Sequence, residues 1–232
     1  MVSRKMPNQM PANQPSSETP NQRRHRELLF ALLIAYLIGQ RSKLAAIVGI
    51  LTTDGIPLDA FSKIILAILR SSHAYAAMYG RRLTGDDAPL NDEDWAYADL
   101  VMEGQREFFD NFIKQLRDRD PRYVGTSQVD GSPLYKLKPI MSRLDLYLRR
   151  TVGTANEVFV SASPDDALFW WVLGENEDHC SDCPDLAAGS PYTKESLPTV
   201  PGAAETICQL GCLCSVVRED GATTLDPRID IS

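Results

Sequence analysis

No cysteine precedes Cys180, and all five cysteines of the chain fall within residues 180–214. Cysteines scattered along a chain suggest a disulfide framework or buried apolar thiols, whereas a cluster in a reducing compartment indicates metal ligation. The position of the cysteines therefore indicates a metal site in one short C-terminal region.

Positive charge is also scarce, with 24 Lys and Arg against 31 Asp and Glu and a formal net charge of -7. Phosphate contacts need clustered Lys and Arg, so a uniformly basic surface for nucleic acid is excluded. One local basic segment remains, formed by Arg23, Arg24, His25 and Arg26. We interpret it as the solvated start of a helix, with contact to DNA or to an acidic partner as the alternative.

A targeting or membrane-spanning segment is missing as well. Arg4 and Lys5 give a positive start, but prolines, asparagines and glutamines follow where an apolar region should be. The longest apolar run, Leu28 to Gly39, is too short to cross a bilayer and is stopped by polar residues at 40–43. We therefore expect synthesis in the cytoplasm and no membrane contact.

Catalytic motifs are absent from the sequence. It has no HExxH, no HxE paired with PCxxC, no phosphate loop, no dinucleotide fingerprint and no GxSxG elbow. We predict that the protein is not an enzyme. The acidic residues near the cysteines are interpreted as a solvated turn rather than as the source of a general base: Glu175, Glu177, Asp178, Asp182 and Asp185.

Apolar residues at helical spacing dominate the chain up to residue 156. They predict an αα-hairpin from Glu27 to about Tyr79, a helix that Asn91 caps and that ends near Asp120, and a further helix with Pro139 as its first residue. A lone histidine, His73, is expected to be a partly buried packing residue. The long helices predict a mainly α fold.

The periodicity changes after Gly153. Val158 to Val160 and Leu168 to Leu173 predict two short strands, in which Trp170 and Trp171 point to opposite faces. The fold class is therefore mainly α with a small α+β C-terminal zinc-binding module. We predict a disordered basic arm at residues 1–24, a helical domain at 25–156, a short-strand, cysteine-rich metal-binding module at 157–218 and a tail at 219–232.

The candidate metal ligands are Cys180, Cys183, Cys208, Cys212 and Cys214. The CxxC pair is typical of half of a structural zinc site, and Zn²⁺ takes four ligands, so one thiol is left over. Cys208 and Cys212 would share a helix face, and Cys212 and Cys214 a strand face. The sequence does not decide which four bind.

Other roles for the cysteines stay open. A CxxC redox site, disulfides or plain buried thiols are the alternatives to a metal, although no βαβ pattern of a thioredoxin-like redox protein surrounds Cys180. His179 adjoins Cys180 and is expected to point away. The proline- and serine-rich segment at 184–205 has little apolar material with which to fold, and a bound metal would supply the missing stabilisation.

The order of these features resembles the C-terminal module of phage head morphogenesis proteins, also called minor head or minor capsid proteins. The residues that carry the resemblance are Trp171 to Leu173, Asn176 to His179, Cys180 to Leu186 and Cys208 to Val216. The helix around residues 142–156 is similar to the arginine-bearing helix that precedes the family's module. Many members have histidine where this chain has Cys208.

The resemblance implies a low-copy virion component, assembled in the host cytoplasm, that associates with portal or major capsid proteins. It also implies a zinc-stapled structural role in head assembly, for which we expect apolar surface on the helices between Leu28 and Leu69 and possible self-association. A zinc-containing DNA-binding or packaging-accessory protein, which would contact DNA through Arg23 to Arg26, is the first alternative. A metal-dependent hydrolase is the second.

Overall fold

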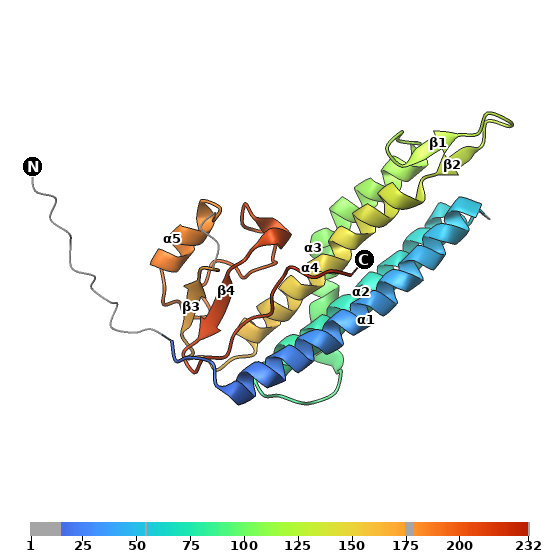
Figure 1. The fold of residues 1–232 in the computed structure, drawn as a ribbon. Coiled ribbons are helices and arrows are strands. Elements are labelled where there is room, and N and C mark those ends of the chain that lie inside the picture. The colour runs from blue at the N-terminus through green and yellow to red at the C-terminus, as the bar shows by residue number, and fades with distance from the viewer. Residues whose placement is uncertain (1–14, 54, 175–178, 232) are drawn as a thin grey trace, which may run out of the picture.

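Four long helices form the body of the protein in the computed structural model, which describes residues 15–53, 55–174 and 179–231. They are α1 (Pro20–Thr53), α2 (Leu58–Arg82), α3 (Asp92–Arg117) and α4 (Leu137–Ser161). α2 packs against α1, α3 and α4, and the four helices lie side by side (Figure 1). The mainly helical fold that the sequence predicts is confirmed.

Spacing of apolar residues explains why these helices pack together. Leu29, Leu33 and Leu37 on α1 are buried at intervals of four residues, and Leu44, Val48 and Leu51 continue the same face. The start of α3 is fixed by Asn91, whose side chain accepts hydrogen bonds from the backbone of Glu93 and Asp94 in a capping box.

The C-terminal region adds short strands beside one end of the helical body (Figure 1). β3 (Phe169–Val172) pairs antiparallel with β4 (Ser215–Arg218), and α5 (Asp182–Ala188) and the 3₁₀ helix η1 (Gln209–Gly211) lie between them in sequence. Burial alternates along β3, as expected for a strand, so Trp171 is buried and Trp170 is partly exposed. A separate hairpin, β1 (Val124–Thr126) with β2 (Pro133–Tyr135), joins α3 to α4.

Two predicted helix boundaries are wrong. Val158 to Val160 do not form a strand, because α4 continues to Ser161 and begins at Leu137 rather than at Pro139. A short apolar run fits a buried helix as well as a strand, and here Ala155 and Phe159 extend the buried helical face. The predicted strand thus belongs to the helical body.

The predicted arm at residues 1–24 is also corrected in its last part. α1 begins at Pro20, so the basic residues at 23–26 are helical. Thr19 Oγ1 accepts a hydrogen bond from the Gln22 backbone N–H, and the Gln22 side chain accepts one from the Thr19 backbone N–H. This reciprocal pair is a capping box, with Pro20 as the first helical residue. Residues 1–14 lie outside the described part of the chain.

The predicted tail at residues 219–232 is packed rather than free over its described part. Leu225, Ile229 and Ile231 are buried. The Asn156 side chain donates to the Leu225 carbonyl at 3.0 Å and accepts from the Leu225 N–H at 2.7 Å. The C-terminal segment after β4 therefore runs back along α4, and its buried side chains belong to the core (Figure 1).

The polar residues at 40–43 do not interrupt α1. Gln40 is buried, and the Arg41 guanidinium forms an ion pair with Asp145 of α4 at 2.9 Å. The expectation that this apolar segment is too short to cross a bilayer is therefore wrong: the unbroken α1 is long and apolar enough, by length and composition alone, to cross a membrane. Its buried leucine face also fits a core helix of a helical bundle.

Candidate metal site

Two segments that are far apart in the sequence carry the five cysteines. Cys180 precedes α5 and Cys183 lies in its first turn, whereas Cys208 and Cys212 flank η1 and Cys214 immediately precedes β4. Because β3 and β4 pair antiparallel, the chain that leaves β3 and the chain that enters β4 lie at the same end of the small sheet. Strand pairing thus brings the two cysteine segments together.

Cys183 lies at the centre of the cluster. Its Sγ atom is 3.3 Å from Cys180 Sγ, 3.8 Å from Cys208 Sγ and 3.9 Å from Cys212 Sγ. The Sγ atoms of Cys180, Cys183 and Cys208 lie within 4.8 Å of one another, and so do those of Cys183, Cys212 and Cys214. The predicted convergence is confirmed, and the cluster could hold a metal ion.

The geometry leaves the choice of four ligands open, because Cys183 belongs to both groups of three. The expectation that Cys208 and Cys212 share an α-helix face is wrong, since the turn between them is a short 3₁₀ helix. His179 belongs to neither group among the described residues. Glu175, Glu177 and Asp178, predicted to form an acidic turn, lie outside the described residues.

Burial determines the chemistry of these thiols. Cys183, Cys212 and Cys214 are buried, and Cys180 and Cys208 are partly exposed. Burial raises the pKa of the Cys183 thiol and also that of Cys212. Burial alone would likewise raise the pKa of Cys180, but its hydrogen bonds with Cys183 and Cys208 lower it to about 7. A cation would supply the positive charge that buried thiolates need.

Several polar side chains hold the two segments in place, and sequence reasoning missed them. An Asp182 carboxylate oxygen accepts from the Ile207 backbone N–H at 2.8 Å, which links α5 directly to the segment before Cys208. Thr206 Oγ1 lies 3.3 Å from Cys208 Sγ. The prediction that Asp182 and Asp185 belong to a solvated turn is wrong, because both lie in the first turn of α5. The position of Asp182 between Cys180 and Cys183 was the available signal, because groups beside metal ligands commonly hold them in place.

The segment between Cys183 and Cys208 has more structure than its composition suggests. The Phe169 and Tyr192 backbones exchange hydrogen bonds at 2.8 and 2.7 Å, and the Trp171 N–H donates to Ser190 Oγ at 2.8 Å. Val200 and Ala203 are buried. The segment is therefore attached to β3 and to the helical body, and a metal would secure its ends.

Close packing joins this module to α4. An added Cβ at Gly153 would overlap the Gly202 carbonyl, so glycine is required where the helix meets the loop. Asn156 Nδ2 donates to the Pro201 carbonyl at 2.9 Å. Gly202 itself has a φ of +82°, a conformation that favours glycine. The cysteine-rich module is therefore fixed on the helical body rather than tethered to it.

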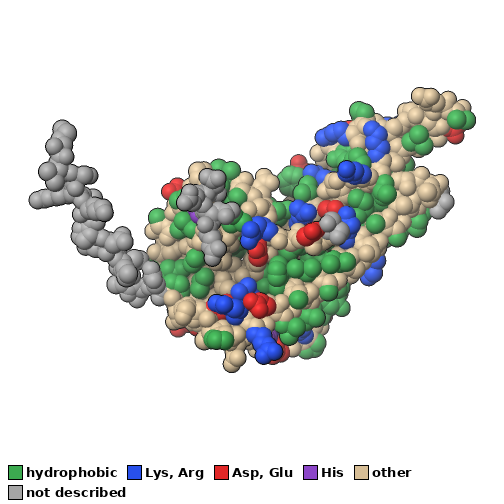
Figure 2. Space-filling view, in the orientation of Figure 1, with side chains coloured by type: hydrophobic (Ala, Val, Ile, Leu, Met, Phe, Trp, Pro, Cys, Tyr) green, Lys and Arg blue, Asp and Glu red, His purple; other side chains and the backbone are tan. Residues whose placement is uncertain are grey.

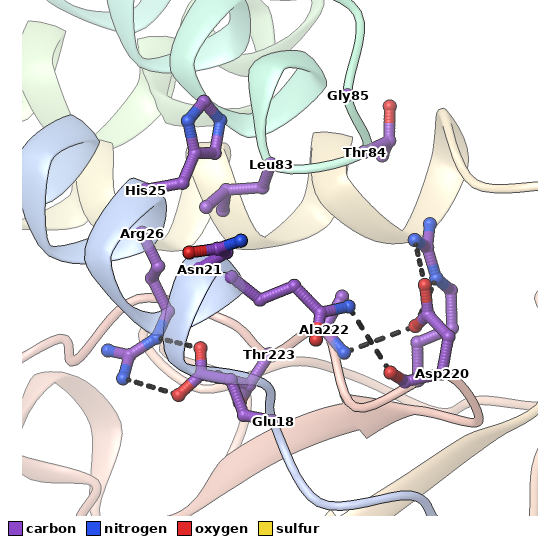
Figure 3. A pocket seen from close by; sticks show the side chains of 12 residues that line it. Glu18, Asn21, His25, Arg26, Leu83, Thr84, Gly85, Asp220, Ala222 and Thr223 are labelled. Atoms are coloured by element: carbon purple, nitrogen blue, oxygen red, sulfur yellow. Dashed lines mark hydrogen bonds and ion pairs between the residues drawn. The ribbon is translucent and has the colours of Figure 1, made fainter.

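The basic segment at the start of α1 lines a cavity of about 350 Å³ between α1, the turn after α2 and the turn after β4 (Figure 3). Arg26 forms an ion pair with Glu18 at 2.8 Å, and Arg23 approaches the same carboxylate at 3.5 Å. His25 Nε2 lies 3.2 Å from the Arg82 carbonyl oxygen. Part of the positive charge predicted to contact DNA is thus neutralised within the chain.

The chain matches no protein-family model, and it matches no curated protein and no solved structure.

Proposed function

We propose that this protein is a non-enzymatic minor head protein of a tailed bacteriophage, whose C-terminal module is held together by one structural Zn²⁺ ion. It would act in the virion, after assembly in the host cytoplasm, by associating with portal or major capsid proteins. One observation carries the proposal: the paired strands β3 and β4 bring the sulfur atoms of five cysteines close together. The two segments that supply them follow each other in the same order as in the family that the sequence resembles.

Two of the sulfur distances fit a tetrahedral thiolate site. Tetrahedral Zn²⁺ with thiolates at about 2.3 Å places sulfur atoms about 3.8 Å apart. The distances from Cys183 Sγ to Cys208 Sγ and Cys212 Sγ are 3.8 and 3.9 Å, whereas Cys180 Sγ is closer, at 3.3 Å, and would have to move outward around a metal. A shell of sulfur ligands alone has no open coordination position, which favours a structural over a catalytic metal.

The arrangement of the chain supports a docking role better than a nucleic-acid role. The helical body is rigidly joined to the metal module through Gly153 and Asn156. Arg23 and Arg26 share Glu18, which leaves less free positive charge for phosphates. A packaging-accessory role that needs DNA contact therefore has less support than a structural one.

Metal analysis tests the zinc part of the proposal. The purified chain should contain one zinc per molecule, and serine variants of the five cysteines should separate four ligands from one spare thiol. Ser181→Ala, beside the site but without a sulfur, is the matched control and should keep its zinc. Iron in place of zinc, or full zinc content in all five serine variants, would refute it.

Particle composition tests the head-protein part. Density-gradient particles from cells that express the chain with its neighbouring genes should contain it at far lower copy than the major capsid protein. Cys183→Ser should reduce its incorporation, whereas Ser181→Ala should not. Absence of the wild-type chain from both mature and precursor heads would reject this function even if zinc is present.

A further inference from the structure

We propose that the groove between α3 and α4 binds an amphipathic helix of a partner protein, with an acidic side chain of that helix paired to Arg143. The groove lies apart from the cysteine sulfur atoms, and the inference does not depend on the head-protein proposal. The partner is defined by its chemistry: an apolar helix face with an acidic residue at one end and a basic residue at the other.

The groove follows from the way the helices pack. α3 and α4 each pack against α2 but make few close backbone contacts with each other. Between them lies a cavity of about 670 Å³, lined by every third or fourth residue from Val101 to Phe108 on α3 and from Arg143 to Arg150 on α4. This spacing places the lining residues of each helix on one face. Each wall is ~10 Å long, or about two helical turns, which is room for a short helix.

Large apolar side chains of both walls are exposed. Phe108 on α3 and Leu146 on α4 are 61 and 48% exposed, and both line the groove. In the space-filling view, Lys and Arg side chains lie among hydrophobic ones over α3 and α4 (Figure 2). Apolar anchors on two neighbouring helices are typical of a groove that receives the apolar face of a third helix.

One cation in the groove lacks a counter-ion. Arg150 is paired with Glu157 at 2.7 Å, whereas Arg143 forms no ion pair with the described residues and lies over the Tyr147 ring, 5.5 Å from its centroid. Arg143 Nε and the Tyr147 hydroxyl are buried, and no hydrogen bond of ordinary geometry satisfies either of them. A carboxylate bound to the Arg143 guanidinium would supply the missing acceptor.

Unpaired charges of opposite sign mark the two ends of the groove. Glu205, which forms no ion pair with the described residues, lines the end next to the metal module, where Arg150 Nη1 donates to the Gly202 carbonyl at 3.4 Å. Arg143 lies about two turns away along α4. A helix with an acidic and a basic residue about seven positions apart, and apolar residues between them on the same face, would complement both charges. Residues 1–14 of this chain contain no Asp or Glu and do not supply such a carboxylate.

Affinity selection on the full-length, metal-loaded chain tests the groove with a yeast-displayed library of alanine-rich helical peptides of about 16 residues, randomised on one face. Selected peptides should carry apolar residues at the centre of that face, with Asp or Glu at one end and Lys or Arg at the other. Counter-selection on Phe108→Ala removes peptides that bind elsewhere. No enrichment over the counter-selection, or enriched peptides without an acidic residue, would overturn the inference.

Fluorescence anisotropy of one enriched peptide measures what each wall contributes. The groove is smaller than a standard interface, so we expect a Kd of tens of micromolar. Arg143→Glu should weaken binding at least tenfold, because it places like charges together, and a peptide with Lys in place of its acidic residue should recover the affinity. Lys138→Glu, exposed on α4 outside the groove, is the matched control. Equal effects of the two variants, or no recovery, would exclude the pairing with Arg143.

The apolar anchor has its own control. Phe108→Ala should weaken the peptide several-fold, whereas Leu100→Ala should not, because Leu100 is exposed on the same helix outside the groove. Equal losses would place the peptide on another surface. Sedimentation velocity of the wild type should show a monomer, and a dimer abolished by Phe108→Ala would assign the groove to a second copy instead. Zinc content measured in the same samples keeps this test separate from that of the metal site.

Discussion

Replacing Gly153 with alanine tests whether the metal module and the helical body form one packed unit. Gly153 is buried on α4, and a Cβ there would overlap the Gly202 carbonyl and the Arg150 guanidinium. Since α4 is anchored in the body, the loop around Gly202 must move. That movement would also weaken the hydrogen bond from Asn156 to the Pro201 carbonyl.

The expected change in the free energy of unfolding combines two destabilising contributions and one stabilising contribution. Overpacking of a core typically costs about 1–3 kcal/mol, and a lost hydrogen bond costs about 1 kcal/mol more. Alanine stabilises a helix by about 1 kcal/mol relative to glycine. We expect Gly153→Ala to lower the free energy of unfolding by about 2 kcal/mol. Gly104→Ala, at an exposed and open position, should instead raise it by up to about 1 kcal/mol.

Urea unfolding of the two alanine variants, followed by circular dichroism, measures the difference. Because both variants gain the same helix propensity, their separation reports the clash at the loop alone. A Gly153→Ala protein as stable as the wild type would show that the loop yields without cost, and that the module is only loosely attached.

Three further perturbations have defined outcomes. Burial, and then the charge of Arg150, lowers the pKa of His73 to about 3, so the folded protein keeps His73 neutral while the unfolded chain gains a proton. The free energy of unfolding of the metal-free protein, measured by urea titration at several pH values, should therefore fall by up to about 1.4 kcal/mol per unit as pH drops below about 6.5. His73→Gln should flatten this slope, and an unchanged slope would contradict the assignment. Asp94→Asn removes the buried carboxylate that pairs with Arg81 and leaves the buried guanidinium with only the half-exposed Asp86, so it should cost about 3 kcal/mol. Asp99→Asn, in an exposed pair, should cost less than about 1 kcal/mol in the same urea assay. Equal losses would refute this contrast between buried and exposed pairs. Chelation of the metal should speed amide hydrogen exchange within residues 180–214 and leave exchange in α2 unchanged, as followed by mass spectrometry. Equal acceleration in both regions would contradict a metal that stabilises only the cysteine-rich module.

Long-range periodicity and capping chemistry made much of the helical body predictable. Asn91 was recognisable as a cap, and its capping box is formed as the sequence indicated. Thr19 and Gln22 carry the same signal at the start of α1, next to Pro20, but they stand among polar and basic residues that also fit a solvated arm. The convergence of the cysteines was predictable because their spacing has few other physical uses.

Tertiary packing decided what the sequence could not. Val158 to Val160 are too few to distinguish strand from helix, and their place on α4 depends on core contacts. His73, expected to be partly buried, is fully buried, with Nδ1 2.8 Å from Thr154 Oγ1. Asn156 holds the C-terminal segment through hydrogen bonds to a residue 69 positions away. No local pattern reveals such a partner.

X-ray absorption at the zinc edge of the purified full-length chain tests the central claim most directly. Sulfur atoms from both cysteine segments should appear as a single shell of four at about 2.3 Å, and mass spectrometry of the same sample should find no disulfide. A shell that contains oxygen or nitrogen, a chain that carries no metal, or disulfide-linked cysteines would contradict the account.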